Sequence, residues 1–238
     1  MWTGTGPDIE LDNQVARVAQ LFYSLRIALG ILETEYVALP SAPRLAPPCF
    51  PYIAFYGNDR KITYKERLHC SDQKATAIFA AEDPEGKRLF IKFTSRYNEQ
   101  AHRLLHEKGY APALHHCSET VAGSGCFMVV MDWVDGEYMF GKLFTEDDLR
   151  RVREAKDLLH EKQLVFGDLR SNNIIKPADG SGVMLVDFDW CASAGQGRYP
   201  LTINSDPSCG WHPGVGPGVI MLKEHDDHLY ARLSSNTE

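Results

Sequence analysis

Two short stretches decide the fold of this chain: Phe-Gly-Asp-Leu-Arg-Ser-Asn-Asn at residues 166–173 and Val-Asp-Phe-Asp at residues 186–189. Within them, Asp168 precedes Asn173 by five positions, and Asp187 follows after a turn and an apolar run. Carboxylate and amide oxygens are the ligands that Mg²⁺ prefers, and a further carboxylate can accept a proton from a substrate. Asp168, Asn173 and Asp187 are therefore candidates for a site that combines a cation with a base.

The composition is that of a globular protein. The chain has 238 residues, of which 44% are hydrophobic and 24% are charged, and its formal net charge is −7. This charge argues against nucleic acid as a partner, because nucleic-acid surfaces are rich in Lys and Arg. No pair among the six cysteines has the spacing of zinc ligands, so we expect reduced, structural thiols.

The sequence also contains signals that bear on where in the cell the protein is located. The N-terminus has no basic segment followed by an apolar one, as a secretory leader would. No uninterrupted apolar run approaches about 18 residues, the length that predicts a membrane span. We therefore expect no membrane contact and an intracellular protein, either cytoplasmic or nuclear.

Patterning divides the chain into four parts. Residues 1–39 hold an amphipathic helix at 9–36, residues 40–58 form a proline-rich linker, and two lobes follow at 59–134 and 135–238. One apolar stripe at helical spacing runs along the helix, formed by Val15, Val18, Phe22, Leu25, Leu29 and Leu32. The helix either docks on its own domain or binds a partner, for example in a coiled coil.

Short strands dominate the first lobe, and helices lead the second. Strands are expected at 61–69, 76–81, 88–93, 114–118 and 127–133, and a helix at 98–108. The second lobe is expected to hold a helix from the capping residue Thr145 to about residue 163, strands at 174–176 and 183–187, and a last helix at 219–233. A sheet-rich half followed by a helix-led half predicts an α+β fold with two lobes.

The order of Asp168, Asn173 and Asp187 resembles that of the protein-kinase superfamily, and the resemblance extends over roughly residues 60 to 190. It implies a bilobal fold with a five-stranded antiparallel sheet in the N-lobe and a truncated, mainly helical C-lobe. It also implies ATP and Mg²⁺ as cofactors, with Asp168 as the base and with Asn173 and Asp187 as the metal ligands.

Further nucleotide-binding residues follow from the same resemblance. Lys92, within an apolar strand, would grip the phosphates, and Glu99 at the start of the next helix would hold that lysine. Taken singly, Lys92 could equally be an edge-strand lysine and Glu99 a solvated helix residue. The strand that would contact adenine ends in Met131 as gatekeeper, followed by the hinge residues Asp132, Trp133 and Val134.

The chain departs from the kinase pattern in its loops. The segment 69–75 has no glycine, where the family has a glycine-rich phosphate loop. Phe166 and Gly167 replace the His-Arg pair, as in atypical and small-molecule kinases such as aminoglycoside phosphotransferases. Asp189 replaces the last glycine of Asp-Phe-Gly; it either faces solvent or caps the loop, or it adds a carboxylate to the metal site.

The end of the chain is also unusual. The segment after Asp187 is short and has no Ala-Pro-Glu motif. Asp226 or Asp227 would stand in for the aspartate by which a kinase's central helix holds its catalytic loop. The motifs at 167–170, 187–190 and 223–226 look most like those of the fungal protein-kinase-like domains.

These features support a leading hypothesis and several alternatives. The leading one is ATP- and Mg²⁺-dependent transfer of a phosphoryl group to a hydroxyl, of the Ser/Thr protein kinase type, with Asp168 as the base. The missing glycine loop and Asp189 suit a pseudokinase or interaction module. A small-molecule kinase and a kinase fold turned to adenylyl transfer also stay open. The acceptor is not defined by the sequence.

Overall fold

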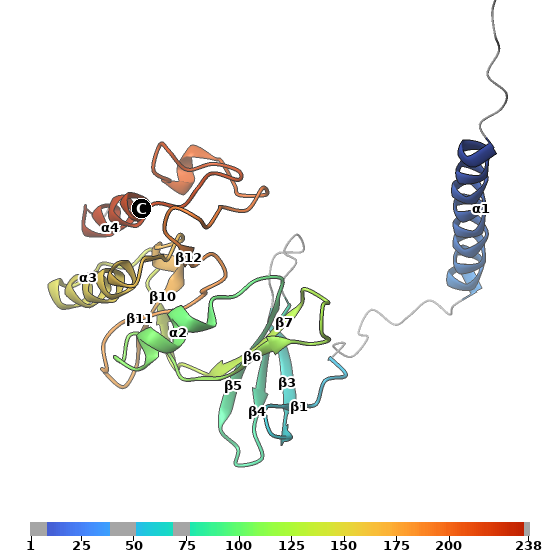
Figure 1. Cartoon of the computed structure of the whole chain (residues 1–238). Helices are drawn as coiled ribbons and strands as arrows, with labels where there is room; N and C mark the ends of the chain where they lie inside the picture. The colour runs from blue at the N-terminus through green and yellow to red at the C-terminus, as the bar shows by residue number, and fades with distance from the viewer. Residues whose placement is uncertain (1–8, 39–50, 69–76, 236–238) are drawn as a thin grey trace, which may run out of the picture. The chain divides into compact units, whose positions relative to one another are not determined.

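The computed structural model describes residues 9–38, 51–68 and 77–235. The glycine-free loop at 69–75 and most of the proline-rich linker, up to residue 50, lie outside the described residues. The chain forms two compact units, Met1–Cys49 and Phe50–Glu238, and each is described here by itself (Figure 1).

The first unit contains one helix, α1 (Ile9–Ala38), close to the predicted bounds. Its apolar residues are not confined to the predicted stripe, because Ile27 and Ile31 lie on other sides of the helix. By length and composition alone, the stretch Gln14–Glu35, with a mean hydropathy of 1.4, could cross a membrane. Polar residues such as Gln20, Ser24 and Arg26 interrupt the apolar run, as the sequence indicated, but the stretch is apolar on average. The absence of a membrane span stays a prediction.

The first lobe of the second unit is a five-stranded antiparallel sheet. In spatial order its strands are β3 (Thr63–Leu68), β4 (Ala77–Glu82), β5 (Arg88–Thr94), β7 (Phe127–Asp132) and β6 (Leu114–Glu119). A short hairpin of β1 (Phe55–Tyr56) and β2 (Arg60–Lys61) precedes it. Strand alternation directs Leu89 and Ile91 of β5 into the core under the sheet, and places Lys92 on the opposite face.

Helix α2 (Glu99–His106) follows β5 and connects the two lobes. The side chain of Asn98 caps it by accepting a hydrogen bond from the amide of Ala101. The amide of Asn98 donates to the carbonyl oxygen of Phe188, at 3.2 Å. The start of α2 is therefore fixed against the Asp-Phe-Asp segment of the second lobe.

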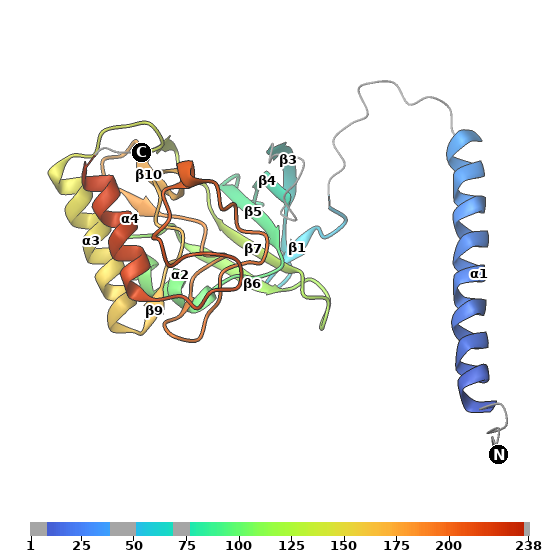
Figure 2. The same cartoon turned by 90° about the horizontal axis from the view of Figure 1, so that it is seen from above.

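Two helices lie side by side in the second lobe, α3 (Glu146–Glu161) and α4 (Lys223–Ser235), as Figure 2 shows. Thr145 and Asp148 form the predicted capping box of α3. Helix α4 begins four residues later than predicted. The reason is that the amide of Met221 donates to the carbonyl oxygen of Gly197, which holds the preceding segment in an extended conformation.

Short elements complete the second lobe. They are β8 (Gly136–Tyr138), β9 (Leu164–Val165), η1 (Ser171–Asn173), β10 (Ile174–Pro177), β11 (Met184–Leu185), β12 (Ala192–Ser193) and η2 (Pro207–Cys209). The main core cluster packs α2, α3 and α4 around Phe166 and Phe188, both fully buried. The predicted α+β architecture with a five-stranded antiparallel sheet is confirmed.

Candidate active site

Asp226 on α4 holds the loop that carries Asp168. Its carboxylate is fully buried and accepts hydrogen bonds from the amides of Phe166 at 2.7 Å and Gly167 at 2.8 Å. Asp227, the other candidate, is half exposed and pairs with Lys156. Of the two predicted stand-ins, Asp226 is therefore the residue that fixes the loop, and the prediction is confirmed in that form.

Gly167 has a structural reason to replace the usual arginine. Its φ is +84°, in the left-handed region, and a Cβ atom at this position would lie 2.2 Å from the methyl carbon of Met221. The left-handed backbone favours glycine, and any other residue here would also displace the flexible end of the Met221 side chain. The backbone geometry is therefore the main reason for glycine before Asp168.

Asp168 lines the larger of two neighbouring cavities and is engaged by an arginine that the sequence did not single out. Arg170 donates from Nε to Oδ1 at 2.5 Å and from Nη2 to Oδ2 at 3.0 Å, which is a bidentate pair. The Arg170 guanidinium also lies 4.4 Å above the ring of Trp211. Burial raises the pKa of Asp168 above its usual value, and Arg170 opposes that rise.

Asn173 and Asp187 lie beside the same loop, and each of them lines both cavities. The side-chain nitrogen of Asn173 donates to the backbone oxygen of Asp168 at 2.9 Å, which leaves its oxygen for another contact. Asp187 has a φ of +69°, so the left-handed residue is this aspartate and not Asp189. Asparagine and aspartate tolerate this region better than other non-glycine residues.

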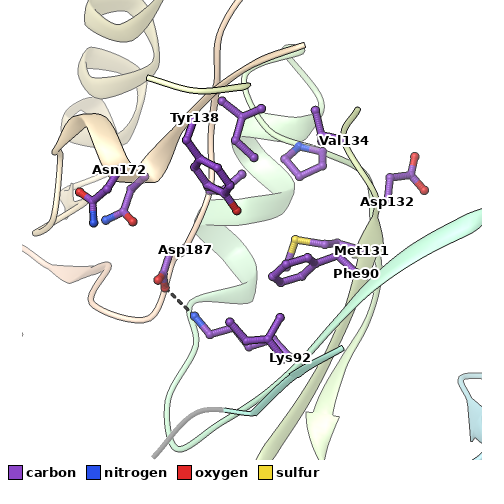
Figure 3. A pocket seen from close by; sticks show the side chains of 13 residues that line it. Phe90, Lys92, Met131, Asp132, Val134, Tyr138, Asn172 and Asp187 are labelled. Carbon is purple, nitrogen blue, oxygen red and sulfur yellow. Dashed lines mark hydrogen bonds and ion pairs between the residues drawn. The ribbon is translucent and has the colours of Figure 1, made fainter. Parts of the chain in front are cut away.

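The predicted pair between Lys92 and Glu99 is wrong. The Lys92 ammonium lies 2.6 Å from Oδ1 of Asp187 and 2.8 Å from Oδ1 of Asp189 (Figure 3 draws the first contact). Glu99 instead pairs with Arg103 on the partly exposed face of α2. Because the cap residue just before it is bonded to the Asp-Phe-Asp segment, the first turn of α2 directs Glu99 away from the lysine.

The three charged groups shift each other's pKa values. Burial lowers the pKa of Lys92, but Asp187 and Asp189 outweigh burial and raise it, so the amine stays protonated. Burial likewise opposes ionisation of Asp187, yet attraction to Lys92 leaves its pKa below the usual value. Burial, followed by repulsion from Asp187, raises the pKa of Asp189 to about 6.

An apolar cavity of about 320 Å³ opens next to Lys92 (Figure 3). Met131 and Val134 line it, as predicted, together with apolar and aromatic side chains from both lobes: Ile78, Phe90, Tyr138, Ile175 and Val186. A cavity with apolar walls and a polar end can hold a flat aromatic ring that carries a charged group.

One hinge residue differs from the prediction. Asp132 lines the cavity as predicted, although its carboxylate points away and binds His115 at 2.5 Å and Lys87 at 2.6 Å (Figure 3). Trp133 is absent from the cavity lining; its ring stacks on Arg88, 4.2 Å from the guanidinium. The hinge side chains therefore stabilise the strand ends, and Met131 and Val134 form the wall.

A second, larger cavity of about 690 Å³ lies on the other side of Asp168 and Asp187. The segment after the Asp-Phe-Asp motif forms much of its wall, including Trp190 and Trp211, whose ring centres are 5.6 Å apart. Arg96 also lines it and donates to backbone carbonyl oxygens of Asp189 and Arg198. This aromatic wall was not predicted, because its residues are scattered through a loop without periodicity.

Two groups of side chains in the described part of the chain have the residue types of a cation site. Asn173 and Asp187 offer an amide oxygen and a carboxylate facing the cavities, which fits Mg²⁺. His212, Glu224 and His225 lie within 4.8 Å of one another. However, backbone amides donate to Nδ1 of both histidines, so each neutral ring carries its proton on Nε2 and offers no lone pair to a metal.

No protein-family model matches the chain. It is 30% identical over 107 residues to the serine/threonine-protein kinase AtPK1/AtPK6 of Arabidopsis thaliana, a match covering 41% of this chain and 22% of that protein. It is 39% identical over 75 residues to cGMP-dependent protein kinase 2 of Rattus norvegicus, covering 32% of this chain and 9% of that protein. The matches thus span a minor part of these relatives.

Among solved structures, the chain is similar to the Cydia pomonella granulovirus kinase PK-1. The two share a TM-score of 0.59 and 14% sequence identity, with 74% of this chain and 69% of that chain covered. At this identity the likeness shows a shared fold. The resemblance to the fungal domains is a finer statement, which these comparisons do not test and which stays a prediction.

Proposed function

We propose that this chain, which belongs to the protein-kinase-like superfamily, transfers the γ-phosphoryl group of ATP to a hydroxyl acceptor. One observation carries the proposal: the almost fully buried Lys92 pairs with Asp187 where the apolar cavity meets the loop of Asp168. An ammonium at the polar end of a cavity of this size suits the phosphates of a nucleotide whose base occupies the apolar part.

ATP is the proposed donor. Its adenine would lie between Phe90 and Tyr138, with Met131 and Val134 along one side. Lys92 would neutralise charge on the phosphates, and its low exposure makes that charge effective because little water screens it. The segment 69–75 lies outside the described residues, so the other phosphate contacts are not assigned.

Mg²⁺ is the proposed cofactor, held by Asn173 and Asp187. When bound, the ion supplies positive charge that stabilises the phosphates during transfer. The side-chain nitrogen of Asn173 is fixed by the backbone of Asp168, so its oxygen is oriented before any cation arrives. Asp187 is the more exposed of the two carboxylates at Lys92, 41% against 13% for Asp189, which supports its assignment to the ion.

Asp168 is the proposed base. In this role it accepts the proton of the acceptor hydroxyl as the oxygen attacks the phosphorus atom. Arg170 holds the carboxylate in one orientation through two hydrogen bonds and keeps a positive charge next to the reacting groups. These are positioning and electrostatic effects, which suit a transition state with little covalent bonding to the protein.

Two classes of hydroxyl acceptor are candidates. Serine or threonine in a protein is the first, because the relatives with sequence similarity are serine/threonine-protein kinases. A small hydroxyl compound is the second, favoured by the cavity of about 690 Å³ with its tryptophan wall beside Asp168. A concave aromatic site binds compact molecules well, whereas an extended peptide needs a groove.

A transfer assay with ATP labelled at the γ-phosphate tests the proposal. Wild type should label a member of a peptide library or of a set of small hydroxyl compounds, and the class that is labelled decides between the candidates. Asp168→Asn should bind Mg²⁺-ATP like wild type but lose transfer by about 10²-fold or more. Tight Mg²⁺-ATP binding without labelling in either set would favour the pseudokinase alternative. Labelling that is unaffected by Asp168→Asn would contradict the assignment of Asp168 as the base.

A further inference from the structure

We propose that Asp189 is the positioning residue of Lys92, in place of a carboxylate from helix α2. The proposal rests on the proposed function, because it concerns how the nucleotide-binding lysine is held. Asp189 replaces the last glycine of the Asp-Phe-Gly motif, and its contacts in the structure indicate a role for the carboxylate at this position.

Both carboxylate oxygens of Asp189 contact strand β5. Oδ1 lies 2.8 Å from the Lys92 ammonium, and Oδ2 accepts a hydrogen bond of 2.8 Å from the Thr94 hydroxyl. Lys92 and Thr94 are two residues apart on β5 and so lie on the same face of the sheet. The hydrogen bond from Thr94 fixes the carboxylate to the strand. Oδ1 contacts Lys92 as an ion pair without hydrogen-bond geometry, so its hold on the lysine is electrostatic.

Asp187 is less suited to hold Lys92 during the reaction. It touches the lysine through Oδ1, but it is also the carboxylate that faces the cation site. An oxygen that binds a cation attracts the lysine less, because the two positive charges repel each other. Among the described residues, Asp189 is the carboxylate that contacts Lys92 and is not assigned to the ion.

The Asp-Phe-Asp segment is itself held in place from several sides. Nε of Arg96 donates to the backbone oxygen of Asp189. The Phe188 ring stacks on the His102 ring of α2, with ring centres 4.6 Å apart. The side-chain nitrogen of Asn98 donates a hydrogen bond of 3.0 Å to the backbone oxygen of Cys191. The carboxylate that orients the lysine therefore belongs to a packed loop, and Glu99 on the outer face of α2 is dispensable.

A double-mutant cycle on kcat tests this. Asp189→Asn keeps the shape and an oxygen for Thr94 but removes the charge, so it should lower kcat by about 10²-fold without raising the KM for ATP. In the Lys92→Ala background the same change should have almost no further effect. The matched control, Glu99→Gln, should change kcat by less than about twofold. Asp189→Glu should recover part of the activity.

Two outcomes would overturn the proposal. If Asp189 were instead a cation ligand, Asp189→Asn would raise the Mg²⁺ concentration needed for half-maximal rate and would still act in the Lys92→Ala background. If Glu99→Gln had the larger effect on kcat, α2 would supply the partner of the lysine after all.

A second cycle, on melting temperature without nucleotide, separates this inference from the proposed function. The losses from Lys92→Ala and Asp189→Asn should be strongly non-additive, and those from Lys92→Ala and Glu99→Gln additive. An inactive wild type with this coupling intact would refute the proposed function and leave the Lys92–Asp189 assignment standing. Additive losses from Lys92→Ala and Asp189→Asn would refute the assignment itself.

Discussion

Asp226 accepts a hydrogen bond of 2.8 Å from the amide of Gly167, which lies 59 positions away in the sequence. A second amide, that of Phe166, binds the other oxygen of the same carboxylate. A helix that is distant in sequence thus determines the position of the loop that carries Asp168. The short second lobe retains the contact on which the geometry of the site depends.

We predict that Asp226→Ala destabilises the protein by about 3 kcal/mol, because it leaves two buried amides without an acceptor. Urea denaturation measures this directly. Asp227→Ala is the matched control, since that carboxylate is half exposed and its pair with Lys156 should contribute less than about 1 kcal/mol. Equal losses from the two variants would show that the loop does not depend on Asp226.

Gly167→Ala should also destabilise, by about 2 kcal/mol or more, because the backbone is left-handed and the new methyl group meets Met221. Thermal unfolding of the single variant and of Gly167→Ala with Met221→Ala separates the two causes. In the Met221→Ala background, Gly167→Ala should lower the melting temperature by less than in wild type, because the steric contact is gone. The remaining loss measures the cost of the left-handed backbone. No loss in the single variant would contradict the close packing at this position.

The activity should depend on pH through Asp168. The base must be deprotonated, and burial raises its pKa, so kcat/KM should fall on acidification at a higher pH than for an ordinary aspartate. Arg170 opposes this rise, and Arg170→Gln should therefore move the acidic limb of the profile to still higher pH. Profiles of kcat/KM against pH for wild type and for Arg170→Gln test the direction of this shift. A shift of the acidic limb to lower pH in the variant would contradict the prediction.

We expect Trp211 to contribute to binding of the acceptor and not to binding of ATP. It lines the larger cavity and supports the Arg170 guanidinium, so Trp211→Ala should raise the KM for the acceptor by about tenfold and leave the KM for ATP unchanged. Trp133→Ala is the control, because that ring stacks on Arg88 outside both cavities. Equal effects of the two variants would contradict the assignment of the larger cavity.

The sequence predicted those features that depend on local pattern. Strand β5 is a short apolar run, and the capping box at Thr145 begins α3, so both elements were found near their observed bounds. These two signals lie within a few neighbouring residues. Asp226 was one of two candidates because of the resemblance to the kinase family, and not because of a local pattern.

The remaining features depend on contacts between distant segments. The pair of Lys92 with Asp189 joins residues 97 positions apart, and it exists because the start of α2 is bonded to Phe188 and turns Glu99 outward. The tryptophan wall arises from a loop with no periodicity, which sequence patterns cannot orient. The apolar character of α1 was underestimated because an uninterrupted run was required, although mean hydropathy is the more direct criterion.

The most direct test of the central claim is thermal unfolding with and without Mg²⁺ and ATP. A ligand that binds only the folded protein must raise the melting temperature by mass action. We predict a rise for wild type that requires both Mg²⁺ and ATP and that is lost in Lys92→Ala and in Asp187→Ala, each compared with its own unliganded state. No rise for wild type at millimolar ATP, or an equal rise in both variants, would contradict a nucleotide site built on Lys92 and Asp187.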